Sequence, residues 1–138
     1  MDIKGKVNAL IQKHETSCPF KIAAAKGIHV IQENLGSNLG YYNKIFRIPM
    51  IHIHESAAEA QKKFICAHEL GHAVCHPNSN TPFLKAHTLF STSKIEKEAN
   101  SFAVELLFSD EGASPILTVQ EAVEEYKIPE QILKEVGS

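Results

Sequence analysis

The chain has no tryptophan, only three cysteines and no long hydrophobic run. Cys18, Cys66 and Cys75 cannot all pair within one chain and form no C-x-x-C motif, which disfavours a disulfide framework or a thiolate zinc knuckle. No apolar run reaches the roughly 18 residues of a membrane span, and the first residues lead into polar sequence rather than a signal-peptide core. We therefore expect a cytoplasmic protein that does not use a membrane.

An excess of charge of one sign is also missing. Lys and Arg number 14 against 16 Asp and Glu, for a net charge of −2. The sequence also has no arginine-rich stretch. Together with the balanced charge, this disfavours a protein that binds nucleic acid mainly through contacts with the phosphate groups. Hydrophobic residues at 43% and charged residues at 22% are ordinary globular usage. The length of 138 residues predicts a single domain over residues 1–138, with 113–138 as a short helical tail.

Apolar periodicity and chain breakers predict an α+β arrangement. The expected helices cover residues 3–15, 19–26, 57–76 and 93–108, with two short helices at 118–126 and 129–136. The expected strands cover residues 28–32, 39–43 and 46–54, and residues 78–92 are expected to form an irregular loop. Because turn residues connect the strands, we expect a small antiparallel sheet packed on the helices.

Six of the eight histidines lie between His52 and His87. Two of them belong to the motif His68-Glu69-Leu70-Gly71-His72, inside the helix expected over residues 57–76. At 3.6 residues per turn, the imidazoles of His68 and His72 lie one above the other and can reach a single ion. Glu69 is rotated about 100° away, where it can take a proton from a zinc-activated water. The motif predicts His68 and His72 as zinc ligands and Glu69 as the general base.

The surroundings of the motif favour this functional interpretation. Residues 64–75 are otherwise apolar or small, which predicts a buried helix. Burying His68, Glu69 and His72 without partners would cost several kcal/mol, and a metal ion with its water removes that cost. The alternative is that hydrogen bonds within the core satisfy the histidines.

A catalytic zinc usually has three protein ligands and one open position, so a third ligand is needed. A third histidine of the metzincin type is excluded, because Cys75 and Asn78 stand where that class has Gly and His. The helix expected over residues 93–108 offers three carboxylates instead, those of Glu96, Glu98 and Glu105.

Helical geometry ranks these three carboxylates. Glu96 lies about 60° from the centre of the apolar stripe, against about 100° for Glu98 and about 120° for Glu105. We therefore expect Glu96 to be the third ligand, with Asn100 one turn further on placed to orient a ligand. The pattern Ser93-x-x-Glu96 also fits a capping box, in which Glu96 would serve only the start of the helix.

The remaining histidines are weaker candidates. His76 follows His72 by four residues and competes as a ligand, although the helix dipole alone favours a histidine in the last turn. His87, in the loop between the two long helices, is placed to hydrogen-bond an oxyanion. His52 and His54 share one face of a strand, which we expect to be exposed rather than to bind a metal.

The helical tail expected over residues 113–138 is acidic, which argues against binding to nucleic acid. Its two short helices resemble a helix-turn-helix in outline. The segment carries Glu121, Glu124, Glu125, Glu130 and Glu135, which would repel phosphates. We therefore expect no direct nucleic-acid partner.

Two segments, His68 to His76 and Glu96 to Leu107, resemble the hallmark segments of the ImmA/IrrE metallopeptidase family. Gly40-Tyr41-Tyr42, Ile51-His52-Ile53 and the residues 124–129 also resemble that family. The resemblance implies a zincin-like minimal metallopeptidase domain in which His68, His72 and Glu96 bind zinc as in thermolysin and Glu69 is the general base. An acidic residue usually stands at the position of Asn100, and an amide there would support the ligand histidine more weakly.

The resemblance also implies a function. Members typically belong to prophages or other mobile elements, where they cleave or inactivate a helix-turn-helix repressor and so derepress genes. We therefore expect a zinc endopeptidase whose protein substrate is such a repressor. Two alternatives stay open. The first is a non-catalytic, zinc-stabilised module that binds the repressor or acts within a toxin–antitoxin pair, and the second is a DNA-binding regulator whose affinity falls steeply with salt.

Overall fold

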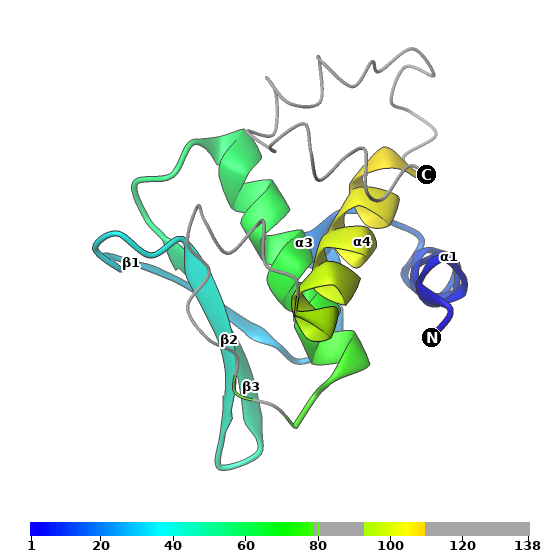
Figure 1. Ribbon diagram of the computed structural model, residues 1–138, viewed down its shortest axis with the longest axis horizontal. Helices are drawn as coiled ribbons and strands as arrows, with labels where there is room; N and C mark the ends of the chain where they lie inside the picture. Colours follow the sequence, from blue (N-terminus) through cyan, green and yellow to red (C-terminus); the bar gives the residue numbers. More distant parts are fainter. Residues whose placement is uncertain (79, 81–92, 110–138) are drawn as a thin grey trace.

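A long helix, α3 (Glu59–Cys75), lies at the centre of the computed structural model, which describes residues 1–78, 80 and 93–109 (Figure 1). Within the described residues it follows two helices and three strands and precedes one further helix. These elements are α1 (Ile3–His14), α2 (Pro19–Ala25), β1 (His29–Glu33), β2 (Gly40–Ile45), β3 (Ile48–His54) and α4 (Lys94–Phe108). The predicted α+β class is confirmed, and each of these elements was predicted with bounds within a few residues of those observed.

The three strands form a mixed sheet in the order β1-β3-β2. The hairpin of β2 and β3 is antiparallel, as predicted, but β1 runs parallel to β3. The prediction of a wholly antiparallel sheet was therefore wrong. β3 takes the central position and contains the fully buried residues Ile51 and Ile53. A central strand is covered by a neighbouring strand at each edge, which favours such burial. Alternation along a sequence specifies which face of a strand is buried, and it does not specify the neighbouring strand.

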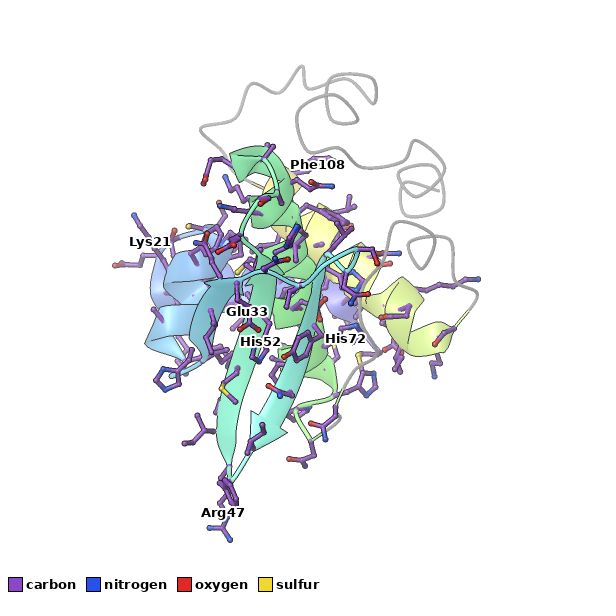
Figure 2. The ribbon with its side chains drawn as sticks, turned by 90° about the vertical axis from the view of Figure 1, so that its left-hand side faces the viewer. Lys21, Glu33, Arg47, His52, His72 and Phe108 are labelled. Carbon is purple, nitrogen blue, oxygen red and sulfur yellow. The ribbon has the colours of Figure 1, made fainter. Side chains whose placement is uncertain are left out.

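Proline is rare in a central strand because it cannot donate to the ladder. Pro49 pairs with Lys44 of β2, whereas β1 pairs with β3 only from Met50 onward. Pro49 thus lies just before the segment of β3 that pairs with β1, where the register gives it a partner on the β2 side only. A two-residue turn, Phe46 and Arg47, joins β2 to β3 at the end of the sheet (Figure 2) and sets the register that places Gly40 opposite Ile53.

The helices lie on one side of the sheet (Figure 1). α3 packs against β2 and β3, and α4 packs against α3 and α1. The core between these layers is built from large apolar side chains that include Tyr42, Ile51, Ile65, Leu70 and Phe102. Since α3 has neighbours on both sides, its middle is buried all round, as its apolar composition predicted.

Several predictions concern residues outside the described part of the chain. They include the two short helices of the tail, the irregular loop with His87, and the extent of a single domain over residues 1–138. Among the described residues, no helix combines the length and the apolar character that a membrane crossing requires.

Candidate metal and active site

A glycine allows the two long helices to approach each other closely. A Cβ atom at Gly71 would lie 3.0 Å from Cβ of Phe102 and 3.2 Å from Cα of Ala99, both on α4. At contacts this short, a larger residue fits only if its neighbours on α4 give way by a few tenths of an ångström. The absence of a side chain at Gly71 therefore brings the histidine face of α3 up to α4.

His68 is oriented by an amide on α4. It is 1% exposed, and its Nδ1–H donates to Oδ1 of Asn100 at 2.9 Å. This bond keeps the proton on Nδ1, so that the lone pair lies on Nε2. Nε2 is buried, has no hydrogen-bond partner among the described residues, and lies 3.5 Å from Oε1 of Glu96. An unpartnered, unprotonated imidazole nitrogen inside the core is suited to binding a metal.

His72, one turn further along α3, faces the same carboxylate. Its Nε2 donates to Oε1 of Glu96 at 2.8 Å and lies 3.1 Å from Oε2. The side chain is 1% exposed, and within the described ranges its Nδ1 has no hydrogen-bond partner. The Nε2 atoms of the two histidines thus converge on a single oxygen, Oε1 of Glu96.

The carboxyl group of Glu96 is held in its ionised form. Burial alone would raise its pKa, but the hydrogen bond from His72 and the interactions with both histidines together lower the pKa to about 2. Glu96 is 5% exposed. Two imidazoles and one ionised carboxylate form a donor set found in catalytic zinc sites, so these residues fit a divalent metal.

Glu69 lies beside the histidine pair. It is 1% exposed, and one donor atom each from His68, Glu69 and His72 lie within 4.8 Å of one another. A Cβ atom at Gly40 would come within 3.8 Å of its Oε2, and within 2.6 Å of both O of His52 and Cγ2 of Ile65. The glycine at the start of β2 therefore lets the sheet close over this part of α3.

The other carboxylates of α4 do not join this cluster. Glu98 lies 3.5 Å from Nε2 of His76, so that this histidine at the end of α3 faces a different carboxylate. Ser93 is the N-cap of α4 without a capping side-chain hydrogen bond. Since Glu96 contacts both histidines, capping alone does not explain it. His87 lies outside the described residues.

We expected His52 and His54 to lie on an exposed face of a strand, and for His52 this expectation was wrong. That side chain is 7% exposed, stacks on Tyr41 with ring centroids 4.0 Å apart, and hydrogen-bonds Glu33 through Nδ1 and Asn43 through Nε2. Figure 2 looks onto this face of the sheet, with Glu33 beside His52. Partners from neighbouring strands bury the ring, and sequence alternation carries no information about them.

Sequence reasoning also missed two glycines that shape the site, Gly40 and Gly71. An isolated glycine inside a helix commonly has a packing reason, and this is the signal in the sequence that could have identified Gly71.

The chain matches a peptidase family model over residues 23–135, and that family is described as the IrrE N-terminal-like domain. The chain belongs to the IrrE N-terminal-like family. The resemblance inferred from the two helical segments is thereby confirmed. Membership implies a metal, and the histidine pair with Glu96 and Glu69 is where the described residues offer donors for one.

Two curated relatives extend the comparison. An "Uncharacterized immunity region protein 2" of Bacillus phage phi105 is 48% identical over 109 residues, which cover 78% of this chain and 69% of the relative. "Metallopeptidase ImmA" of Bacillus subtilis (strain 168) is 33% identical over 110 residues, which cover 78% of this chain and 64% of the relative. The chain thus spans about two thirds of their length. No solved structure is significantly similar to it.

Replacement of Gly71 by alanine tests the close helix approach. Because the added methyl group meets Phe102 and Ala99, α3 and α4 must move apart by a few tenths of an ångström. We expect a loss of about 1–3 kcal/mol in the free energy of unfolding, and weaker zinc binding because Glu96 moves away from both histidines. Ala73→Gly, on the same helix, is the control for helix propensity. Unchanged zinc affinity in Gly71→Ala would contradict the assignment.

Proposed function

We propose that this IrrE-type chain is a zinc-dependent endopeptidase. His68, His72 and Glu96 hold the metal, Asn100 orients His68, and Glu69 is the general base. The observation that carries the proposal is the convergence of both histidine Nε2 atoms on Oε1 of Glu96, at 3.5 and 2.8 Å, in a buried site. Membership of a peptidase family supports it.

The roles of the side chains follow from their positions. When bound, zinc supplies a Lewis acid that polarises the scissile carbonyl and activates a water molecule. Glu69 takes the proton of the attacking water and passes it to the leaving amine. Asn100 holds the tautomer of His68 that leaves its Nε2 lone pair free for a metal. Burial of these groups strengthens their charge interactions relative to water.

We further propose that the substrate is a helix-turn-helix repressor, which the protein cleaves in the cytoplasm to derepress genes. The family resemblance of the two helical segments supports this, as do relatives named for a phage immunity region and as the metallopeptidase ImmA. The near-neutral net charge of −2 favours a protein substrate over direct binding to nucleic acid.

The test is co-expression of the chain with each helix-turn-helix protein encoded near its gene, followed by mass spectrometry of the products. We expect one repressor to be cut at a defined bond, and a chelator to stop the reaction in purified components until zinc is restored. A non-catalytic module would instead bind the repressor and leave it intact. Binding without any cleavage, in zinc-loaded protein, would overturn the proposed activity.

A further inference from the structure

In the part of the chain that the structure describes, the outer edge of the sheet at β1 has backbone groups that form no hydrogen bond. The carbonyl oxygen of Glu33 accepts from N–H of Glu55, just after β3, at 2.9 Å, so that the backbone of Glu33 faces β3. In a parallel ladder alternate residues face the partner strand. Ile31 and His29 therefore also face β3, and the N–H and C=O groups of Val30 and Gln32 point away from the sheet. No hydrogen bond among the described residues uses these four groups.

The opposite edge of the sheet differs. There N–H of Lys44 donates to Oδ1 of Asn80 at 3.2 Å, and the hydroxyl of Tyr42 donates to O of Pro77 at 2.8 Å. The chain that leaves α3 thus contacts the edge of β2. In the described part of the protein, β1 is the edge available to another strand, and an open edge is a template for pairing.

We propose that β1 pairs in antiparallel fashion with β1 of a second copy of this chain, centred on Ile31. In this register Val30 lies opposite Gln32 of the second copy, and Gln32 opposite its Val30. All four residues point their N–H and C=O groups at the partner, so that four hydrogen bonds form and every outward group is used. A register shifted by one residue would place outward groups opposite inward ones.

The side chains of β1 are complementary to themselves in the same register. His29 lies opposite Glu33 of the second copy, and the two-fold symmetry repeats this pair. His29 is exposed, and the Glu33 side chain is 43% exposed with Oε1 on His52, which leaves its second oxygen for the partner. An imidazole that faces a carboxylate oxygen across a strand pair can donate a hydrogen bond to it, and such polar cross-strand pairs stabilise the pairing. Ile31 faces Ile31 across the axis, so the repeated His29–Glu33 pair and the apolar centre favour a second copy over an unrelated peptide.

A groove beside the edge provides further contact area. It encloses about 420 Å³ between α2 and β1 and is lined by Phe20, Ala24, Gly27, Ile28, His29 and Val30. In the paired form the second copy covers this groove, and the two sheets become one of six strands. Because a five-residue edge is short, the interface lies below the size of a stable complex, and we expect a weak dimer.

The proposed interface is separate from the metal site. Gly40, next to Glu69, lies on β2, and β3 separates β2 from β1. Dimer formation therefore does not depend on the proposed peptidase activity. Failure of one proposal leaves the other standing.

Sedimentation velocity of the purified chain, from about 10 µM to about 1 mM, tests the pairing. We expect a reversible shift from 15.3 kDa toward twice that mass as concentration rises. Gln32→Pro removes one outward N–H for which the described residues provide no hydrogen-bond partner, and proline is tolerated at an edge. This variant should stay monomeric with an unchanged circular dichroism spectrum, and Gln32→Thr should still dimerise.

Two further variants test the register. His29→Glu places like charges opposite each other twice and should raise the dimer Kd at least about tenfold, whereas His29→Lys should not. Ile31→Cys brings two thiols together at a position where facing Cα atoms lie about 4.5 Å apart, within disulfide range. This variant should form a covalent dimer on mild oxidation, and Ile48→Cys should not.

Three outcomes would overturn the proposal. The first is a wild-type chain that stays monomeric up to about 1 mM. The second is a dimer that Gln32→Pro and His29→Glu leave unaffected, since it would use another surface. The third is loss of binding to another protein in Gln32→Pro without any self-association, which would assign the edge to that protein.

Discussion

The Glu69→Gln protein is expected to bind zinc as the wild type does and to cut its substrate at least about 10³-fold more slowly. Glutamine preserves the shape of the side chain, which is 1% exposed beside His68 and His72. Its amide has no basic oxygen that can take a proton from water. The change therefore removes the proposed proton transfer while leaving the proposed metal ligands in place.

The measurements are the cleavage rate of the repressor at saturating concentration and the zinc content per chain. Glu59→Gln is the matched control, because Glu59 lies on the same helix with a side chain 90% exposed, and it should retain full activity. A Glu69→Gln protein that cuts at the wild-type rate would rule out Glu69 as the base. A variant that has lost zinc would show instead that Glu69 holds the metal.

Glu96→Ala is expected to lower zinc affinity by at least about 100-fold, more than the loss of a group that only supports a ligand. The reason is that the carboxylate nearest both histidines is removed, and the low pKa of about 2 keeps it ionised in the wild type. The histidine pair alone leaves a two-ligand site, which is short of the three protein ligands of a catalytic zinc.

Zinc titration against a competing chelator measures this loss. Glu98→Ala is the matched control, because Glu98 lies on the same helix and faces His76 instead. It should leave zinc affinity unchanged. Equal loss of affinity in both variants would mean that removing charge from α4, rather than a specific ligand, weakens the site.

The cluster on α3 and α4 was predictable because it depends on helical geometry. A spacing of four residues puts His68 and His72 on one face, and 100° per residue placed Glu96 nearer the apolar stripe than Glu98. Both inferences need only the pitch of a helix and the burial of its apolar side. The structure brings Glu96 to within 2.8 Å of His72 accordingly.

The sheet was harder to predict because its pairings are distant in the sequence. The run of turns from residue 34 onward indicated hairpins, yet β3 lies between β1 and β2 and pairs in parallel with β1. The burial of His52 depends on Tyr41, Asn43 and Glu33, which come from the two neighbouring strands. Strand order has to be known before such contacts can be inferred.

The donors of the proposed metal site come from α3 and α4, which are separated in the chain by residues 76–93. The covalent connection keeps Glu96 near His68 and His72 at a high effective concentration. A single proteolytic cut in this connection would turn one ligand set into two fragments, held together by the packing of α3 on α4 and by the metal. We therefore expect a cut in this connection to weaken zinc binding, although it touches none of the proposed site residues.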